Sequence, residues 1–148
     1  MTQKWAHLDT KVKLSTLWIT ASLSYLYCDV IGLMDPEMLE QYLAGNVNGL
    51  ALTPGFLFGA AVLISIPILM VLLSRVLDYR ASRWANIAAA TFMTAVQTLT
   101  LFIGWPTPYY LYLSAIEIAC TVLIVGYAWR WRETAAQPGI ASAEAPAL

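Results

Sequence analysis

Charged residues are scarce in this sequence. They make up 11% of its 148 residues, whereas soluble domains average about 25%, and 59% of the residues are hydrophobic. This composition argues against a soluble globular domain. The eight Lys and Arg residues are dispersed along the chain and form no basic patch, so we expect no nucleic-acid partner.

Residues that bind metals or perform redox chemistry are also few. The chain has one histidine, His7, and two cysteines, Cys28 and Cys120, which do not form a C-x-x-C pair. Both cysteines fall inside apolar segments, where a thiol is usually a small hydrophobic packing group. The sequence also lacks the G-x-S-x-G, P-loop and H-E-x-x-H motifs. We therefore predict no catalytic residues, no metal site and no cofactor.

Long apolar segments, by contrast, are abundant. Four of them cover residues 14–34, 56–77, 84–104 and 109–131 approximately. Each has the length of about 20 residues that crosses the hydrocarbon core of a bilayer, where the backbone satisfies its hydrogen bonds as a helix. The sequence predicts an all-α integral membrane protein, an antiparallel bundle of four transmembrane helices over residues 1–132, with the lipid bilayer as its first partner.

All basic residues fall on one side of these four segments. Three precede the first segment, three lie between the second and third, and two follow the fourth: Lys4, Lys11, Lys13, Arg75, Arg80, Arg83, Arg130 and Arg132. Basic residues near the ends of spans are retained in the cytoplasm. We therefore expect both termini to be cytoplasmic.

The only long connection follows the first span. Asp35 can cap a helix, Pro36 suits its first position and Gly45 suits its end, so a short amphipathic surface helix is predicted over 36–44. Residues 46–55 are then an irregular connector. Residues 133–148 are rich in alanine without a periodic apolar face, which predicts a disordered cytoplasmic tail.

Polar residues inside the spans are the candidate functional residues. Asp29 in the first span and Glu117 in the fourth are ionisable, and no Lys or Arg lies within a span to pair with them. At about 1.5 Å per residue, both carboxyls and Gln97 fall at similar depth in the outer half of the membrane, which predicts one shared cluster. Tyr25 shares a helical face with Asp29, and Asn86 shares one with Gln97.

Three accounts of these carboxyls remain open at this point. Asp29 and Glu117 are either protonated and hydrogen-bonded to groups such as Tyr25 or Gln97, or in contact with water or a bound cation. Asp29 alone could also occupy a solvated position at the rim of the membrane. Hydrogen bonds of Ser, Thr and Gln between helices are commonly only packing contacts.

Several stretches of the chain carry a resemblance to known proteins. They are Lys13–Trp18, Tyr25–Asp29, Ser65–Met70, Arg83–Ile87 and the closing Tyr109, Tyr110, Glu117 and Tyr127–Trp131. On these stretches the chain resembles a family of small bacterial four-span membrane proteins of unknown function, over nearly its whole length except the tail. The resemblance implies the four-helix architecture, a bacterial cytoplasmic membrane and an interest in Asp29, Asn86 and Glu117, but no substrate.

The leading functional hypothesis is transport or channel-like movement of a small solute, an ion or a proton, with Asp29 and Glu117 as the site. Four spans make a narrow bundle, so we expect a homo-oligomer or a membrane partner subunit, with close approach at the small residues 88–90. The competing hypothesis is a non-catalytic accessory or scaffold subunit. A membrane enzyme acting on a lipid or quinone ranks third, because no nucleophile or cofactor ligand is evident.

Overall fold

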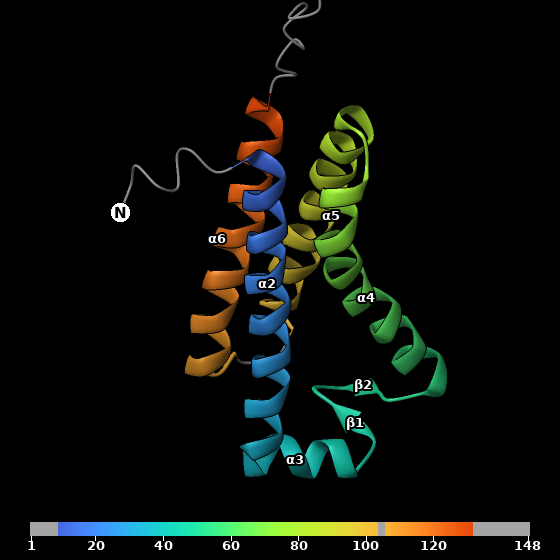
Figure 1. Cartoon of the computed structure of the whole chain (residues 1–148). Helices are drawn as coiled ribbons and strands as arrows, with labels where there is room; N and C mark the ends of the chain where they lie inside the picture. The colour runs from blue at the N-terminus through green and yellow to red at the C-terminus, as the bar shows by residue number, and fades with distance from the viewer. Residues whose placement is uncertain (1–8, 104–105, 132–148) are drawn as a thin grey trace, which may run out of the picture.

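The computed structural model describes residues 9–103 and 106–131, shown in colour in Figure 1. Its helices are α2 (Thr10–Met34), α3 (Pro36–Leu43), α4 (Pro54–Val76), α5 (Tyr79–Thr100) and α6 (Pro108–Arg130). Two short strands, β1 (Asn46–Val47) and β2 (Leu50–Ala51), lie between α3 and α4. The described chain is thus almost entirely helical, in agreement with the predicted class.

Three of these helices are long and apolar enough to cross a membrane, by length and composition. They are α2, α4 and α6. Helix α5 has 22 residues, a length of about 33 Å, but arginines in its first turns and many small polar residues make it less apolar. Within the described residues, therefore, the three apolar helices agree with a membrane-spanning protein, and α5 is amphipathic.

The ends of the helices follow from local capping. The Asp35 carboxylate accepts a hydrogen bond from the backbone N–H of Glu37 at 3.1 Å, and Pro36 occupies the first position of α3, where its missing N–H costs nothing. The Thr53 hydroxyl accepts in the same way from the N–H of Phe56 at 3.2 Å, at the start of α4. The helix α3 occupies eight of the nine residues predicted for the surface helix.

The third predicted span is displaced in the structure. It was expected over 84–104, whereas α5 begins five residues earlier, at Tyr79, and ends at Thr100. The backbone N–H groups of Phe102 and Ile103 bond to carbonyls three residues back, at 3.1 Å each, which tightens the chain and ends the α-helix. The last residue of the predicted segment lies outside the described residues.

The connector predicted over 46–55 contains a β-hairpin. Strands β1 and β2 pair antiparallel, with Asn46 opposite Ala51. The two residues between the strands, Asn48 and Gly49, have φ values of 50° and 84°. Two positive φ values in a two-residue loop are typical of the type I′ turn that Asn-Gly favours. The Asn-Gly pair was therefore a hairpin signal within the irregular connector that we predicted.

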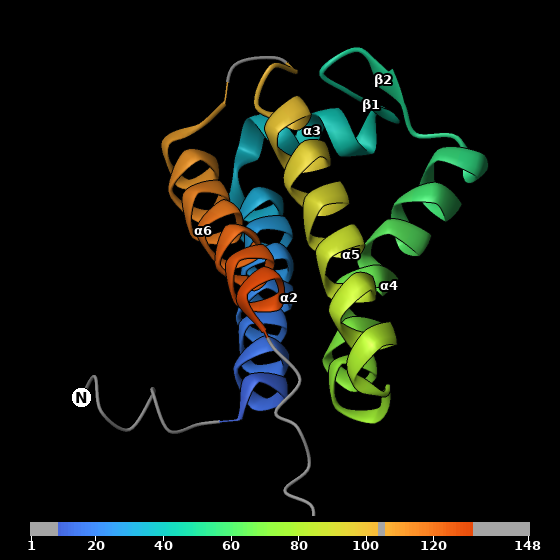
Figure 2. The same cartoon turned by 90° about the horizontal axis from the view of Figure 1, so that it is seen from above.

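The four long helices pack as a bundle with one loose member. Helix α2 packs against both α4 and α6, and α5 packs mainly against α6 (Figures 1 and 2). The start of α2, the turn between α4 and α5 and the end of α6 lie at one end of the bundle, whereas α3 and the hairpin lie at the other. Successive long helices therefore run antiparallel.

The basic residues gather at the end of the bundle opposite α3. Those within the described ranges are Lys11, Lys13, Arg75, Arg80, Arg83 and Arg130, all in the first or last turns of their helices. The Lys11 ammonium donates to the Leu77 carbonyl at 2.6 Å, which ties α2 to the turn between α4 and α5. Lys4 and Arg132 lie outside the described residues, as do His7 and the predicted tail.

Helix α4 leans away from the bundle toward its Pro54 end (Figures 1 and 2). Its buried residues are Pro67, Met70 and Ser74, all in its C-terminal half. Pro67 removes one helical N–H at the point where α4 leaves the other helices. The bundle is consequently tight near the basic end and open near α3.

Candidate functional site

Four of the five predicted site residues lie around one cavity. The four are Tyr25, Asp29, Gln97 and Glu117, supplied by α2, α5 and α6. The cavity has a volume of about 180 Å³, and we call it the inner cavity. Helix α4 lines it with the apolar side chains Ala60, Leu63 and Ile64, and the cavity is partly open. All four long helices thus contribute to a space inside the bundle.

Glu117 is the most unusual group in this cavity. Its side chain is 1% exposed, and within the described residues neither carboxylate oxygen has a hydrogen-bond partner. The Tyr25 hydroxyl is also buried without a partner there. No Lys, Arg or His lines the cavity. A buried charge without a partner is costly in a medium of low dielectric constant, so this carboxyl needs a proton, a cation or water.

Asp29 occupies a different position from Glu117, although both line the inner cavity. The Asp29 side chain is exposed. The two carboxyls are therefore not equivalent. The exposure of Asp29 is compatible with the third of the accounts that the sequence left open, whereas Glu117 is buried.

Gln97 is held by a neighbouring helix. Its amide nitrogen donates to the Ser114 hydroxyl at 2.7 Å, and both side chains are buried. About one helical turn closer to the basic end of the bundle, the Thr94 hydroxyl donates to the Thr121 hydroxyl at 2.7 Å. These two contacts join α5 to α6. They are the interhelical packing bonds expected of such residues, and they fix the wall from which Glu117 projects.

Asn86, the fifth predicted residue, does not lie at the inner cavity. It belongs to a separate buried network, in which its side-chain oxygen accepts from the Trp18 indole N–H at 2.7 Å and from the Ser74 hydroxyl at 2.9 Å. Its amide nitrogen donates to the Ser82 carbonyl at 2.7 Å. Asn86 and Gln97 share one face of α5 but are 11 residues apart, about 16 Å along the axis. The structure thus places Asn86 on the buried face of α5 that also carries Gln97, but away from the inner cavity.

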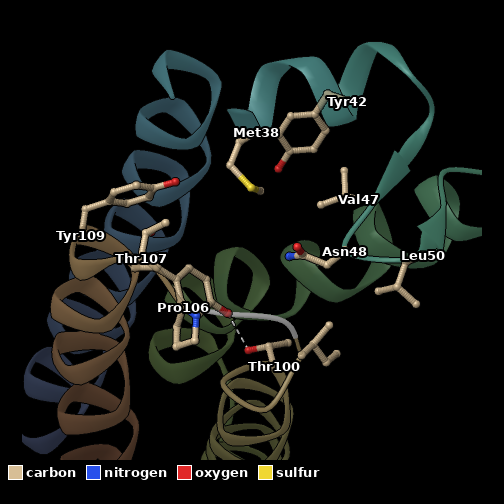
Figure 3. A pocket seen from close by; sticks show the side chains of 11 residues that line it. Met38, Tyr42, Val47, Asn48, Leu50, Thr100, Pro106, Thr107 and Tyr109 are labelled. Carbon is tan, nitrogen blue, oxygen red and sulfur yellow. Dashed lines mark hydrogen bonds between the residues drawn. The ribbon is translucent and has the colours of Figure 1, made fainter. Parts of the chain in front are cut away.

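A second cavity lies beside the inner one, toward α3 and the hairpin. It has a volume of about 210 Å³, and we call it the outer cavity. In Figure 3, Thr107 and Tyr109 lie on one side of this cavity and Asn48 of the hairpin on the other, with Met38 and Tyr42 of α3 above them. None of its lining side chains is Asp, Glu, Lys, Arg or His. Burial, together with the nearby Asp29 carboxylate, raises the pKa of Tyr42, which keeps this phenol neutral.

The two cavities meet at Thr100 and Tyr110, which line both. The Tyr110 hydroxyl donates to the Thr100 hydroxyl at 2.7 Å, the dashed line in Figure 3. This hydrogen bond joins α6 to the end of α5 at the boundary. Neither residue was among the predicted site residues. Their places on the same helical faces as Glu117 and Gln97 were the available signal.

The thiols take no visible part in a metal site. Cys28 lines the inner cavity. Cys120 is buried on α6, three residues after Glu117. Both thiols are free. Over residues 9–103 and 106–131, no group of three or more His, Cys, Asp or Glu side chains could hold a metal ion. The polar groups available at the inner cavity are therefore carboxyl, phenol, amide, hydroxyl and thiol groups.

These features define a class. The described part of the protein is helical, has three helices with the length and composition to cross a membrane, and has a cavity lined by a carboxyl group that has no hydrogen-bond partner among the described residues. The chain belongs to a family of unknown function, DUF6326, whose model matches residues 2–137. This membership confirms the predicted resemblance to an uncharacterised family. No curated protein and no solved structure matches the chain.

Proposed function

We propose that this protein moves protons or small cations across a membrane, with Glu117 as the group that takes them up. The observation that carries the proposal is the isolation of this carboxyl, which is 1% exposed, faces the inner cavity and has no hydrogen-bond partner among the described residues. A carboxyl without a fixed partner can accept and release a proton or cation without first breaking an ion pair. In this proposal Asp29, which is exposed, passes the cation inward to Glu117.

The proposal includes four spans with both termini in the cytoplasm of a bacterial cell. Helix α5, at about 33 Å, has the length of a span, and its amphipathic face is directed at the inner cavity through Met93 and Gln97. The collection of basic residues at the end opposite α3 supports the orientation, because such residues are retained on the cytoplasmic side. The α3 end would then face outward.

The proposal also includes a second subunit, because four helices enclose a narrow bundle. Of the small residues considered for close approach, Ala90 is fully buried within the bundle and is used there. Ala88 is exposed and remains available to a second copy or to a membrane partner subunit.

Reconstitution into liposomes tests the proposal. A pH gradient or a cation gradient is imposed, and flux is followed with a pH-sensitive or cation-sensitive dye. We expect Glu117→Gln to lower the flux by about tenfold or more, which corresponds to about 1.4 kcal/mol in the barrier. Asp29→Asn should lower it less, because its side chain already meets the exterior.

The matched control is Glu40→Gln, since Glu40 is an exposed carboxyl on α3 that lines neither cavity. This variant should retain the wild-type flux. If Asp29→Asn combined with Glu117→Gln leaves both flux and fold unchanged, the carboxyls are not the site.

The accessory-subunit alternative is supported by one observation, the absence of any buried residue in α4 before Pro67. Such a helix offers an apolar face to a partner as well as to lipid. An accessory subunit would co-purify with a partner in fixed stoichiometry, and mutation of exposed residues such as Phe58 would abolish that association. A membrane enzyme is the third proposal, and a lipid or quinone that co-purifies with the protein would favour it.

A further inference from the structure

The inner cavity has a mixed lining that restricts what it can hold. Beside the carboxyls it presents the apolar side chains Ala60, Leu63, Ile64, Met93 and Val96. The apolar residues come from α4 and α5, whereas Glu117 projects from α6. A ligand that fills the cavity therefore meets a charged wall, formed by Glu117 of α6 and Asp29 of α2, and a hydrocarbon wall, formed by α4 and by Met93 and Val96 of α5.

An inorganic cation fits this lining poorly. Ions such as Ca²⁺ take about six to eight oxygen ligands, and Mg²⁺ takes about six in octahedral geometry. The described residues offer no group of three acidic or other metal-binding side chains. A dehydrated inorganic cation would leave most of its coordination shell empty, and a hydrated one would place water against the apolar wall.

An organic ammonium ion matches both walls. Its nitrogen needs one carboxylate, and Glu117 has two oxygens without a partner. The Tyr25 hydroxyl, also without a partner, can accept a further N–H. Its hydrocarbon part removes apolar surface from water against residues such as Leu63 and Val96, at about 25 cal/mol per Å².

The volume limits the size of such a ligand. At about 180 Å³, the inner cavity slightly exceeds a cavity of roughly 150 Å³ that accommodates benzene in another protein. It is smaller than the roughly 300–1,000 Å³ of pockets for drug-sized molecules. A cation with a hydrocarbon part of one six-membered ring is therefore the upper limit.

We infer that the inner cavity binds a small organic ammonium ion, with its nitrogen at the Glu117 carboxylate and its hydrocarbon part against α4 and α5. This inference rests on the proposed function, in that Glu117 takes up the cation, and it names the class of cation. The outer cavity, which is neutral and lined by Tyr42, Tyr109 and Tyr110, is suited to the passage of such an ion because aromatic faces attract organic cations.

Binding to the purified full-length protein in detergent tests the inference. The probe is cyclohexylammonium chloride, measured by titration calorimetry, with cyclohexanol as the neutral probe of the same shape and sodium chloride as the inorganic probe. We expect saturable binding of cyclohexylammonium, with affinity about tenfold or more above that of cyclohexanol, and no competition by sodium at equal concentration. Glu117→Gln should remove this preference, and Glu40→Gln should retain it.

A second variant keeps the test decisive if Glu117→Gln loses binding because it misfolds. Ala60→Phe leaves every carboxyl in place and fills part of the inner cavity, so it should weaken cyclohexylammonium binding by about tenfold. Equal affinity for cyclohexanol, unchanged affinity in Ala60→Phe, or equal competition by sodium would each overturn the inference.

The same preparations separate this inference from the transport proposal. If proton or sodium flux depends on Glu117 but cyclohexylammonium does not bind, transport stands and the ligand class is wrong. If cyclohexylammonium binds at Glu117 but no cation crosses the liposome membrane, the ligand class stands and transport is wrong.

Discussion

The buried network around Asn86 allows a quantitative test of the fold. Asn86 joins three helices, because its side-chain oxygen accepts from Trp18 of α2 and Ser74 of α4 while its amide donates within α5. Both Asn86 and Trp18 are 0% exposed. The perturbation is Asn86→Ala, Trp18→Phe and the double variant, compared with the wild type as a double-mutant cycle.

The magnitude follows from which groups lose their partners. In Asn86→Ala the Trp18 indole N–H is left buried without an acceptor, which costs about 1–3 kcal/mol. The Ser74 hydroxyl retains the Met70 carbonyl at 2.6 Å and adds little. In the double variant no indole donor remains, so the loss in free energy of unfolding should be about 1 kcal/mol smaller than the sum of the single losses. This coupling lies below the maximum of about 1.7 kcal/mol for interhelical hydrogen bonds in membranes.

Reversible unfolding in mixed micelles, followed by far-ultraviolet circular dichroism, measures the four free energies. Thr20→Val is the control partner for Asn86→Ala, since Thr20 is exposed and bonds only to the Thr16 carbonyl of its own helix. That cycle should be additive to within about 0.5 kcal/mol. If the cycle of Asn86 and Trp18 is equally additive, the hydrogen bond contributes nothing measurable and the network does not specify the packing.

Three further predictions concern the cavities and the hairpin. Tyr110→Phe removes the hydrogen bond at the boundary of the two cavities, so maleimide should label Cys28 in the inner cavity faster than in the wild type. Cys120, which lines neither cavity, is the control and should react at an unchanged rate. Gly49→Ala should lower the free energy of unfolding by about 1–2 kcal/mol, because residue 49 has a φ of 84°. Gly59→Ala within α4 should be neutral or stabilise the protein by up to about 1 kcal/mol, because a Cβ there meets no other atom within 4 Å. Thermal unfolding measures both variants. Thr121→Val should cost about 0.6 kcal/mol in the micelle unfolding assay and leave liposome flux unchanged, because its bond to α5 is a packing contact.

Much of the candidate site could be predicted from helical spacing. Period and length place Tyr25 and Asp29 on one face of α2, and Glu117 on the inner face of α6, because a helix repeats every 3.6 residues. Spacing gives a face, however, and not a depth of packing. The 11 residues between Asn86 and Gln97 separate them by about 16 Å along the axis, so their different sites could have been predicted. Spacing could not show that Asp29 is exposed while Glu117 is buried, because exposure depends on how neighbouring helices pack.

The outer cavity could not be predicted in this way. Its walls come from α3, the hairpin and the connection between α5 and α6, and the path of a connection is not set by apolar periodicity. One part of its wall, the hairpin, could be predicted from the local sequence. The Asn48-Gly49 pair favours a two-residue turn, and the turn brings Val47 opposite Leu50 at the lip of the outer cavity. How that hairpin folds over α5 depends on contacts between distant parts of the chain.

The contrast between the two buried polar groups bears directly on function. At Asn86 the chain supplies an acceptor or donor for every neighbouring group, with partners from three helices, as a polar side chain kept for packing requires. At Glu117, in the same bundle and at similar burial, the described residues supply none. A packing role for Glu117 would have to explain why a costlier group, a carboxyl, receives fewer partners than an amide. Under the proposed function the partner of Glu117 is the proton or cation itself, which would account for this difference.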